Sequence, residues 1–98
     1  MKGRAHRAVT RAKLEIADNL NQARKMQRIK MAVLAERCGL SVPTVSKMLN
    51  EGEGSLDTFL RITQALQLLP NIVDATDFLK TPMGRAMALV ATGQRVRT

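Results

Sequence analysis

The most distinctive chemistry in this chain is that of its cationic side chains, which bind phosphate. Among 98 residues there are sixteen Lys and Arg against eight Asp and Glu, which give a net charge of +8. Residues 1–30 hold nine of the basic and two of the acidic side chains, whereas residues 48–79 hold one and five. This asymmetry is typical of a protein that meets a polyanion with one face, although a solvated basic surface with no partner shows the same pattern.

The aromatic content separates the two kinds of nucleic acid. Two Phe, no Tyr and no Trp leave few rings to stack on unpaired bases, as RNA-binding surfaces do. Double-stranded DNA is therefore the favoured polyanion.

Catalytic and metal-binding residue sets are missing from the sequence. One cysteine, Cys38, and one histidine, His6, cannot supply a disulfide or a group of zinc ligands. The eight carboxylates fit helix faces and caps without forming a catalytic set, and no glycine-rich phosphate loop is present. We expect no enzymatic activity, no cofactor and no metal.

Length and hydropathy limit the protein class. A chain of 98 residues forms one small core. No apolar run approaches the roughly 20 residues that a membrane span needs, and the N-terminus lacks the apolar stretch of a secretory signal. We expect a cytoplasmic protein that does not contact a membrane.

The spacing of three residues predicts a helix-turn-helix within residues 31–50. Ala35 lets two helices approach closely, Gly39 supplies a positive φ in the turn, and Val45 returns the second helix to the core. The remaining apolar positions of the segment are Leu34, Cys38, Leu40, Met48 and Leu49. Such a motif is a common scaffold for reading duplex DNA.

The rest of the sequence predicts an all-α protein, because no segment has a strand pattern and the Gly and Pro residues fall at helix ends. Residues 1–10 lack an apolar stripe and are expected to form a basic, mobile arm. The expected helices lie at about 11–28, 31–38, 42–50, from Ser55 to about Leu66, 71–79, and after Thr81-Pro82. We therefore divide the chain into an arm (1–10), a helix-turn-helix domain (11–79), and a C-terminal helix with a basic tail (80–98).

Several helix starts carry clear signals. Ser41 and Ser55 are placed as N-caps, and Pro43 lies in a first turn, where a missing N–H costs nothing. Thr81 and Pro82 repeat this pattern before the last helix.

Apolar residues at helical spacing predict the core. For the first helix the expected inner residues are Ile16, Leu20 and Ala23, with Met26 or Ile29 closing its end. For the fourth helix they are Leu56, Phe59, Leu60, Thr63 and Leu66.

The last helix carries an apolar stripe that a five-helix domain has no need to bury. The stripe consists of Met83, Ala86, Met87 and Val90, at spacings of three, four and seven residues. It either folds back on its own domain or packs on a second subunit or another protein.

From about Ile16 to Leu69 the chain resembles the Xre family, the phage-repressor and Cro type of helix-turn-helix domain. The matching segments are Leu34-Ala35-Glu36, Gly39-Leu40-Ser41, Thr44-Val45-Ser46-Lys47, and Ser55 to Leu60 leading to Ala65-Leu66. The resemblance implies a compact, lambda-repressor-like bundle of five helices. In that family the third helix enters the major groove and the second braces it across the backbone.

The resemblance also implies which residues of the recognition helix contact DNA. Those that face base edges are Val42, Pro43, Thr44 and Lys47, and those nearer phosphate are Ser41 and Ser46. Val42 and Pro43 cannot donate hydrogen bonds from their side chains, so direct polar readout falls to Lys47 and Thr44, with Val42 placed to touch a thymine methyl. Phosphate contacts and DNA shape then supply much of the specificity.

Two positions depart from the family pattern. Where members often have Ser or Thr followed by Gln, this chain has Lys30 and Met31, so a charge replaces an amide that grips phosphate. Members often pair an arginine of the first helix with a glutamate near the end of the recognition helix. Here Arg24 is present, but Leu49 occupies the position of the glutamate. Arg24 then either pairs with Glu51 or points at DNA.

The arginines of the N-terminal arm have two possible roles. Arg4, Arg7 and Arg11 are candidates for the minor groove, as in other DNA-binding arms. The alternative is a disordered arm with no contact.

The end of the chain resembles the tail of small HipB-type regulators, which accompany a HipA-type kinase toxin. The residues concerned are Thr81-Pro82-Met83-Gly84-Arg85-Ala86 and the terminal Arg95-Val96-Arg97. The likeness implies a dimer that represses its own operon and holds the toxin.

Two functions follow from these observations. The first is a homodimeric transcriptional repressor that binds an operator with an inverted repeat, with an antitoxin role as a refinement. The second is a protein-interaction module that captures a toxin or other partner through its C-terminal helix without DNA.

Overall fold

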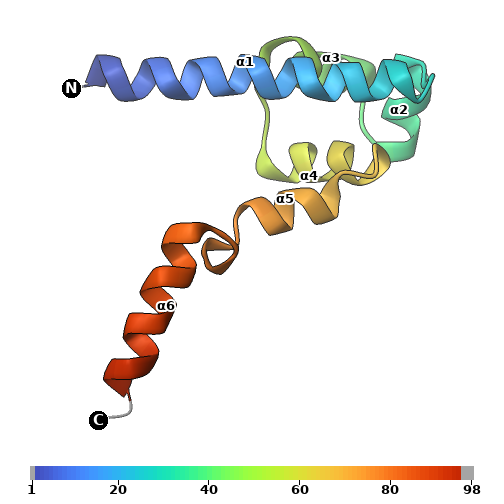
Figure 1. The fold of residues 1–98 in the computed structure, drawn as a ribbon. Coiled ribbons are helices and arrows are strands. Elements are labelled where there is room, and N and C mark those ends of the chain that lie inside the picture. The colour runs from blue at the N-terminus through green and yellow to red at the C-terminus, as the bar shows by residue number, and fades with distance from the viewer. Residues whose placement is uncertain (1, 96–98) are drawn as a thin grey trace. The chain divides into compact units, whose positions relative to one another are not determined.

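The computed structural model describes the backbone of residues 2–95 and the side chains of residues 6–91, and this part of the chain consists of helices joined by short turns, without strands. The elements are α1 (Lys2–Met26), α2 (Met31–Cys38), α3 (Val42–Glu51), α4 (Leu56–Ala65), α5 (Leu69–Ala75), the 3-10 helix η1 (Phe78–Lys80) and α6 (Pro82–Arg95) (Figure 1). The prediction of an all-α protein is confirmed. The chain forms two compact units, Met1–Leu68 and Leu69–Thr98.

The first unit is built from four helices around one core. α3 packs against α1, α2 and α4, and α2 also packs against α4 (Figure 1). The buried apolar side chains are Leu20, Ile29, Leu34, Ala35, Cys38, Val45, Met48, Leu49, Ile62 and Leu66. Ala35 is 3% exposed and Val45 fully buried, as the helix-turn-helix spacing predicts.

α1 begins at Lys2, not at about Arg11, so residues 2–10 are helical and not an irregular arm. Ala, Arg and Lys are strong helix formers, and they recur through this segment with no proline and only Gly3 to oppose them. Helix propagation from the packed part of α1 therefore extends to its N-terminus. Arg4 lies in these first turns, outside the side chains that the structure describes.

Two of the expected core residues are exposed, and of the two alternatives for the end of the first helix Ile29 is the buried one. On α1 the inward residues are Ala17 and Leu20, which leaves Ile16 on the side of the helix and 40% exposed. α1 ends at Met26, and a backbone turn through Arg28 at φ 59° brings Ile29 into the core in place of Met26.

The second of these residues lies on α4. Leu56 is the first residue of this helix and is 70% exposed. The fully enclosed positions lie further along, at Ile62, Thr63 and Leu66. Phe59 and Leu60 are half-buried, so the predicted stripe is correct except at its first residue.

The helix ends follow the predicted caps. The Ser41 and Ser55 hydroxyls accept hydrogen bonds from the backbone N–H groups of Thr44 and Thr58, at 3.2 and 3.0 Å. α2 ends at Gly39, whose φ of 67° lies in the left-handed region that glycine adopts most easily.

The second unit, from Leu69 onward, lacks a core of its own among its described side chains. α5 has no buried residue, and the helix expected over 71–79 is divided into α5 and η1. The Thr76 hydroxyl donates to the carbonyls of Ile72 and Val73, and the Asp77 carboxylate accepts from the Leu79 N–H. Such side-chain bonds to backbone end a helix and start a tighter turn.

α6 begins where sequence predicts, with Thr81 as its N-cap and Pro82 as its first residue. The Thr81 hydroxyl accepts from the Gly84 N–H at 2.9 Å and donates to the Phe78 carbonyl at 2.7 Å. Gly84 is buried, and a Cβ there would collide with the Phe78 carbonyl. The glycine therefore lets α6 pack directly on η1.

We expect Gly52→Ala to destabilise the protein more than Gly39→Ala. The two glycines have nearly the same positive φ, 68° and 67°. An alanine in this left-handed conformation costs about 1–2 kcal/mol at either position. A Cβ at Gly39 would meet only the Arg61 guanidinium at 3.5 Å, whereas one at Gly52 would collide with the Lys13 backbone carbonyl. This collision should add about 1–3 kcal/mol to the loss of unfolding free energy in Gly52→Ala. Urea unfolding of both variants measures the difference.

Equal losses for the two variants would show that the approach of α1 to the end of α3 does not constrain the fold.

Candidate nucleic-acid interface

The outer face of α3 is the surface that the core leaves available. Val45, Met48 and Leu49 are buried on the inner face of this helix. The opposite positions are therefore exposed at Val42, Pro43, Lys47 and Asn50, with Thr44 and Ser46 half-buried. Of the residues predicted to contact DNA on this helix, the structure thus leaves Val42, Pro43 and Lys47 exposed and Thr44 and Ser46 partly exposed.

The start of α3 holds the hydroxyls of Ser41 and Thr44 together. Their oxygen atoms are 2.8 Å apart, and the Ser41 oxygen also accepts from the Thr44 N–H. Thr44 therefore shares its hydroxyl with the helix cap. Lys47, by contrast, projects an ammonium that takes part in none of the ion pairs of the described residues.

Asn50 extends this face and was not predicted from the sequence. It lies three residues after Lys47 and four after Ser46, and its Nδ2 donates to the Ser46 hydroxyl at 2.9 Å. An exposed amide can pair with an adenine edge. The available signal was the helical spacing from Ser46, which places Asn50 on the outer face.

Lys30 lies at the N-terminus of α2, where the first backbone N–H groups lack partners within the helix. It occupies the N-cap position with an extended backbone and makes no side-chain cap bond, and its side chain is exposed. A helix N-terminus with a neighbouring cation is a suitable environment for a phosphate oxygen.

Arg24 is occupied within the protein. Its Nη1 donates to the Ile29 carbonyl at 2.8 Å, and its Nε and Nη2 donate to Asn21 Oδ1 at 3.1 and 2.9 Å. The guanidinium thus bridges α1 to the turn before α2. Neither Glu51 nor any other described carboxylate forms an ion pair with it.

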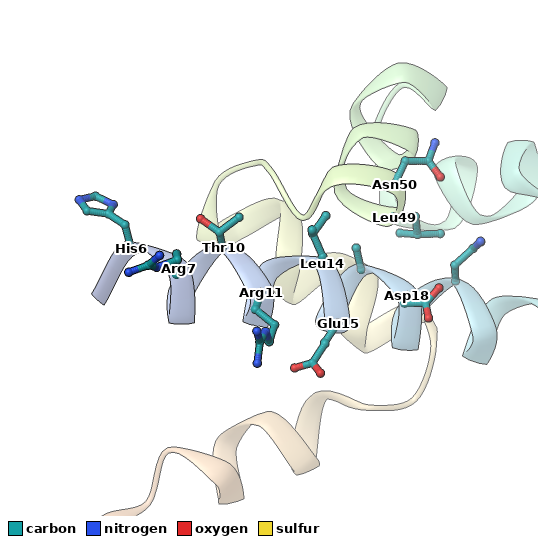
Figure 2. Close-up of a pocket in the computed structure, with 11 residues that line it drawn as sticks. His6, Arg7, Thr10, Arg11, Leu14, Glu15, Asp18, Leu49 and Asn50 are labelled. Carbon is teal, nitrogen blue, oxygen red and sulfur yellow. The ribbon is translucent and has the colours of Figure 1, made fainter. Parts of the chain in front are cut away.

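Arg7 and Arg11 lie on the exposed N-terminal half of α1. Both line a hollow of about 810 Å³ between this half of the helix and the C-terminal end of α3, where Leu49 and Asn50 lie (Figure 2). Glu15 and Asp18 line the same hollow, so its charge is mixed.

The residues of the C-terminal helix that were predicted to contact a partner are all exposed. Met83, Met87 and Val90 on α6 are 65%, 57% and 60% exposed, and Ala86 is also exposed. Leu89 adds a fourth large apolar side chain, 76% exposed, that was not predicted.

The remaining polar groups have structural roles. Burial raises the pKa of the Cys38 thiol, so this group stays protonated and is a poor nucleophile at neutral pH. Within residues 6–91, no three His, Cys, Asp or Glu side chains are grouped so that they could hold a metal ion. Among the described helices, none is both long and apolar enough to cross a membrane.

Comparison with known proteins gives one match. A family model described as helix-turn-helix matches residues 20–71, slightly more than half of the chain. No curated protein and no solved structure is significantly similar to the chain.

We expect Ser41→Ala to lower the free energy of unfolding by about 1 kcal/mol, because it removes the acceptor for the Thr44 N–H. Ser46→Ala is the matched control on the same helix. It removes only the exposed bond from Asn50 and should change stability by less than about 0.5 kcal/mol. Chemical denaturation measures both, and equal effects would contradict the capping role.

Proposed function

The chain belongs to the Xre type of the helix-turn-helix family, whose members are DNA-binding regulators, and we propose that it is a dimeric repressor that reads an inverted repeat in double-stranded DNA. The observation that carries this proposal is the division of α3 into a buried and an exposed face. Val45, Met48 and Leu49 are enclosed by the other helices, whereas Lys47 and Asn50 lie outside. A recognition helix needs this arrangement to enter a major groove without losing its support.

Base readout in this proposal is sparse. Lys47 supplies the main polar contact, Asn50 a second, and Val42 an apolar contact with a thymine methyl. Thr44 contributes less than its position predicts, because its hydroxyl is shared with Ser41. Lys30, Ser41 and Ser46 bind phosphate, and Arg24 acts by holding the turn that presents α2. Contacts with phosphate and the shape of the duplex then supply the remaining specificity.

The N-terminal arginines lie on a helix, which limits how they can reach the minor groove. An α-helix is about 10–12 Å across with its side chains, and the minor groove is about 6 Å wide. A minor-groove role for Arg4, Arg7 and Arg11 therefore requires the first turns of α1 to unwind on DNA.

The exposed stripe of α6 supports a protein partner. We propose that Met83, Ala86, Met87 and Val90 contact either a second copy of the chain or a different protein, such as a HipA-type kinase toxin. Four large apolar side chains more than half exposed on one short helix, counting Leu89, are unusual unless another surface covers them. In the second case the chain is an antitoxin, which represses its own operon and holds the toxin.

The alternative function, a protein-interaction module without DNA, rests on the same stripe. It is distinguished by a footprint on the promoter of this protein's own gene. A protected inverted repeat, with half-sites about one helical turn apart, supports the repressor. No protection at moderate salt supports the module.

For the repressor, Lys47→Ala should weaken operator binding by roughly 1–3 kcal/mol if Lys47 contacts a base. Fluorescence anisotropy with the operator and with a scrambled duplex measures the change. Lys80→Ala is the control, since it removes the same charge from η1, outside the matched domain. Equal loss on both duplexes would make Lys47 a phosphate contact, and no loss would remove it from the interface.

For the partner surface, Met87→Glu combined with Val90→Glu should weaken the contact with the second subunit or with a HipA-type kinase at least about tenfold, because two charges replace apolar area. Both residues are exposed, so helix content measured by circular dichroism should not change. Light scattering of the protein alone and mixed with the kinase gives the measurement. Unchanged association in both would exclude α6 as the contact surface.

A further inference from the structure

The N-terminal half of α1 extends beyond the core without support from the rest of its unit. Every side chain from His6 to Ala12 is exposed, and Val9 and Leu14 are 55% and 53% exposed. An isolated helix of this length is only marginally stable in water. A surface that covers it would supply the missing stabilisation.

The hollow beside this half of α1 shows what kind of surface fits. Leu14 lies near its middle, Arg7 and Arg11 toward the N-terminal side, and Glu15 and Asp18 toward the other (Figure 2). None of the four charged residues takes part in the ion pairs of the described residues. A basic end, an apolar centre and an acidic end in succession are complementary to the same sequence running in the opposite direction.

We propose that a second copy of this chain occupies the hollow, with its α1 antiparallel to the first across a two-fold axis near Ala12 and Lys13. Arg7, Arg11, Leu14 and Asp18 follow each other at spacings of four, three and four residues, which keeps them on one side of a helix. The axis then places Arg7 opposite Asp18 of the second copy. It places Arg11 between Leu14 and Glu15 of that copy.

The two-fold axis repeats each of these contacts. The same patch therefore serves both subunits, as a symmetric dimer requires. The Leu49 and Asn50 end of α3 forms the other wall of the hollow, so in this dimer Asn50 faces the second copy and the base contacts of α3 fall to Lys47 and Val42.

DNA is the less suitable occupant of this hollow. Glu15 and Asp18 would repel phosphate, and Leu14 would gain nothing from it. An apolar centre between charges of both signs is typical of a contact between proteins. This assignment leaves the α6 stripe for a different protein, and it does not depend on DNA binding.

The test is a charge exchange in the full-length protein, with the oligomeric state measured by sedimentation without DNA. Arg7→Glu with Arg11→Glu, and separately Glu15→Arg with Asp18→Arg, should each raise the dimer dissociation constant at least about tenfold, because like charges then face each other. Mixing the two variants should restore a dimer that contains one of each. The matched control, Lys25→Glu with Arg37→Glu, alters charge equally at exposed positions outside the hollow and should leave the dimer intact.

Three results would overturn the proposal. These are a wild-type protein that stays monomeric at high micromolar concentration, variants that remain dimeric, or folded variants that stay monomeric when mixed. If the Arg7 and Arg11 variant remains a dimer but loses affinity for DNA, these arginines bind phosphate instead. Circular dichroism of each variant establishes that loss of the dimer is not loss of the fold.

Discussion

The burial of Val45, Met48 and Leu49 on one side of α3 is the constraint on which the rest of this structure depends. These three side chains fix the rotation of the helix about its own axis, and that rotation decides which residues face outward. Ala35 allows the close crossing with α2, and Gly52 allows the end of α3 to approach the backbone of α1. The exposed position of Lys47 therefore follows from the packing on the opposite side of the helix.

Local signals predicted much of this fold. The bounds of α2 and the starts of α3, α4 and α6 agree with the prediction, because a hydroxyl cap, a first-turn proline or a left-handed glycine acts within a few residues. Helical spacing did not predict the burial of Ala17 in place of Ile16, and it left Met26 and Ile29 as alternatives for the end of the helix. Which residue is buried at this end depends on the direction in which the chain leaves α1. Arg28 adopts a left-handed turn there, which its residue type does not predict.

The functional residues were predictable to a different degree. Helical spacing alone places Lys47 and the α6 stripe at exposed positions. It gives no information on partners, and so it could not show that Thr44 shares its hydroxyl with Ser41 or that Arg24 spends three donors on Asn21 and Ile29. Each of these contacts joins a side chain to a group whose position depends on the folded backbone. Asn50 was not predicted, and its exposure beside Ser46 becomes evident only when the outer face of α3 is considered as a whole.

Two of the turns adopt a left-handed conformation without glycine, at Arg28 and Gln67, with φ values of 59° and 64°. A glycine or asparagine at such a position would make the protein more stable than arginine or glutamine does. This difference matters because the whole free energy of unfolding of a small domain is only about 5–15 kcal/mol. Both turns are exposed and lie outside α3 and α6. Substitutions at these two turns can therefore change the thermal stability of the protein without altering the exposed residues of α3 and α6.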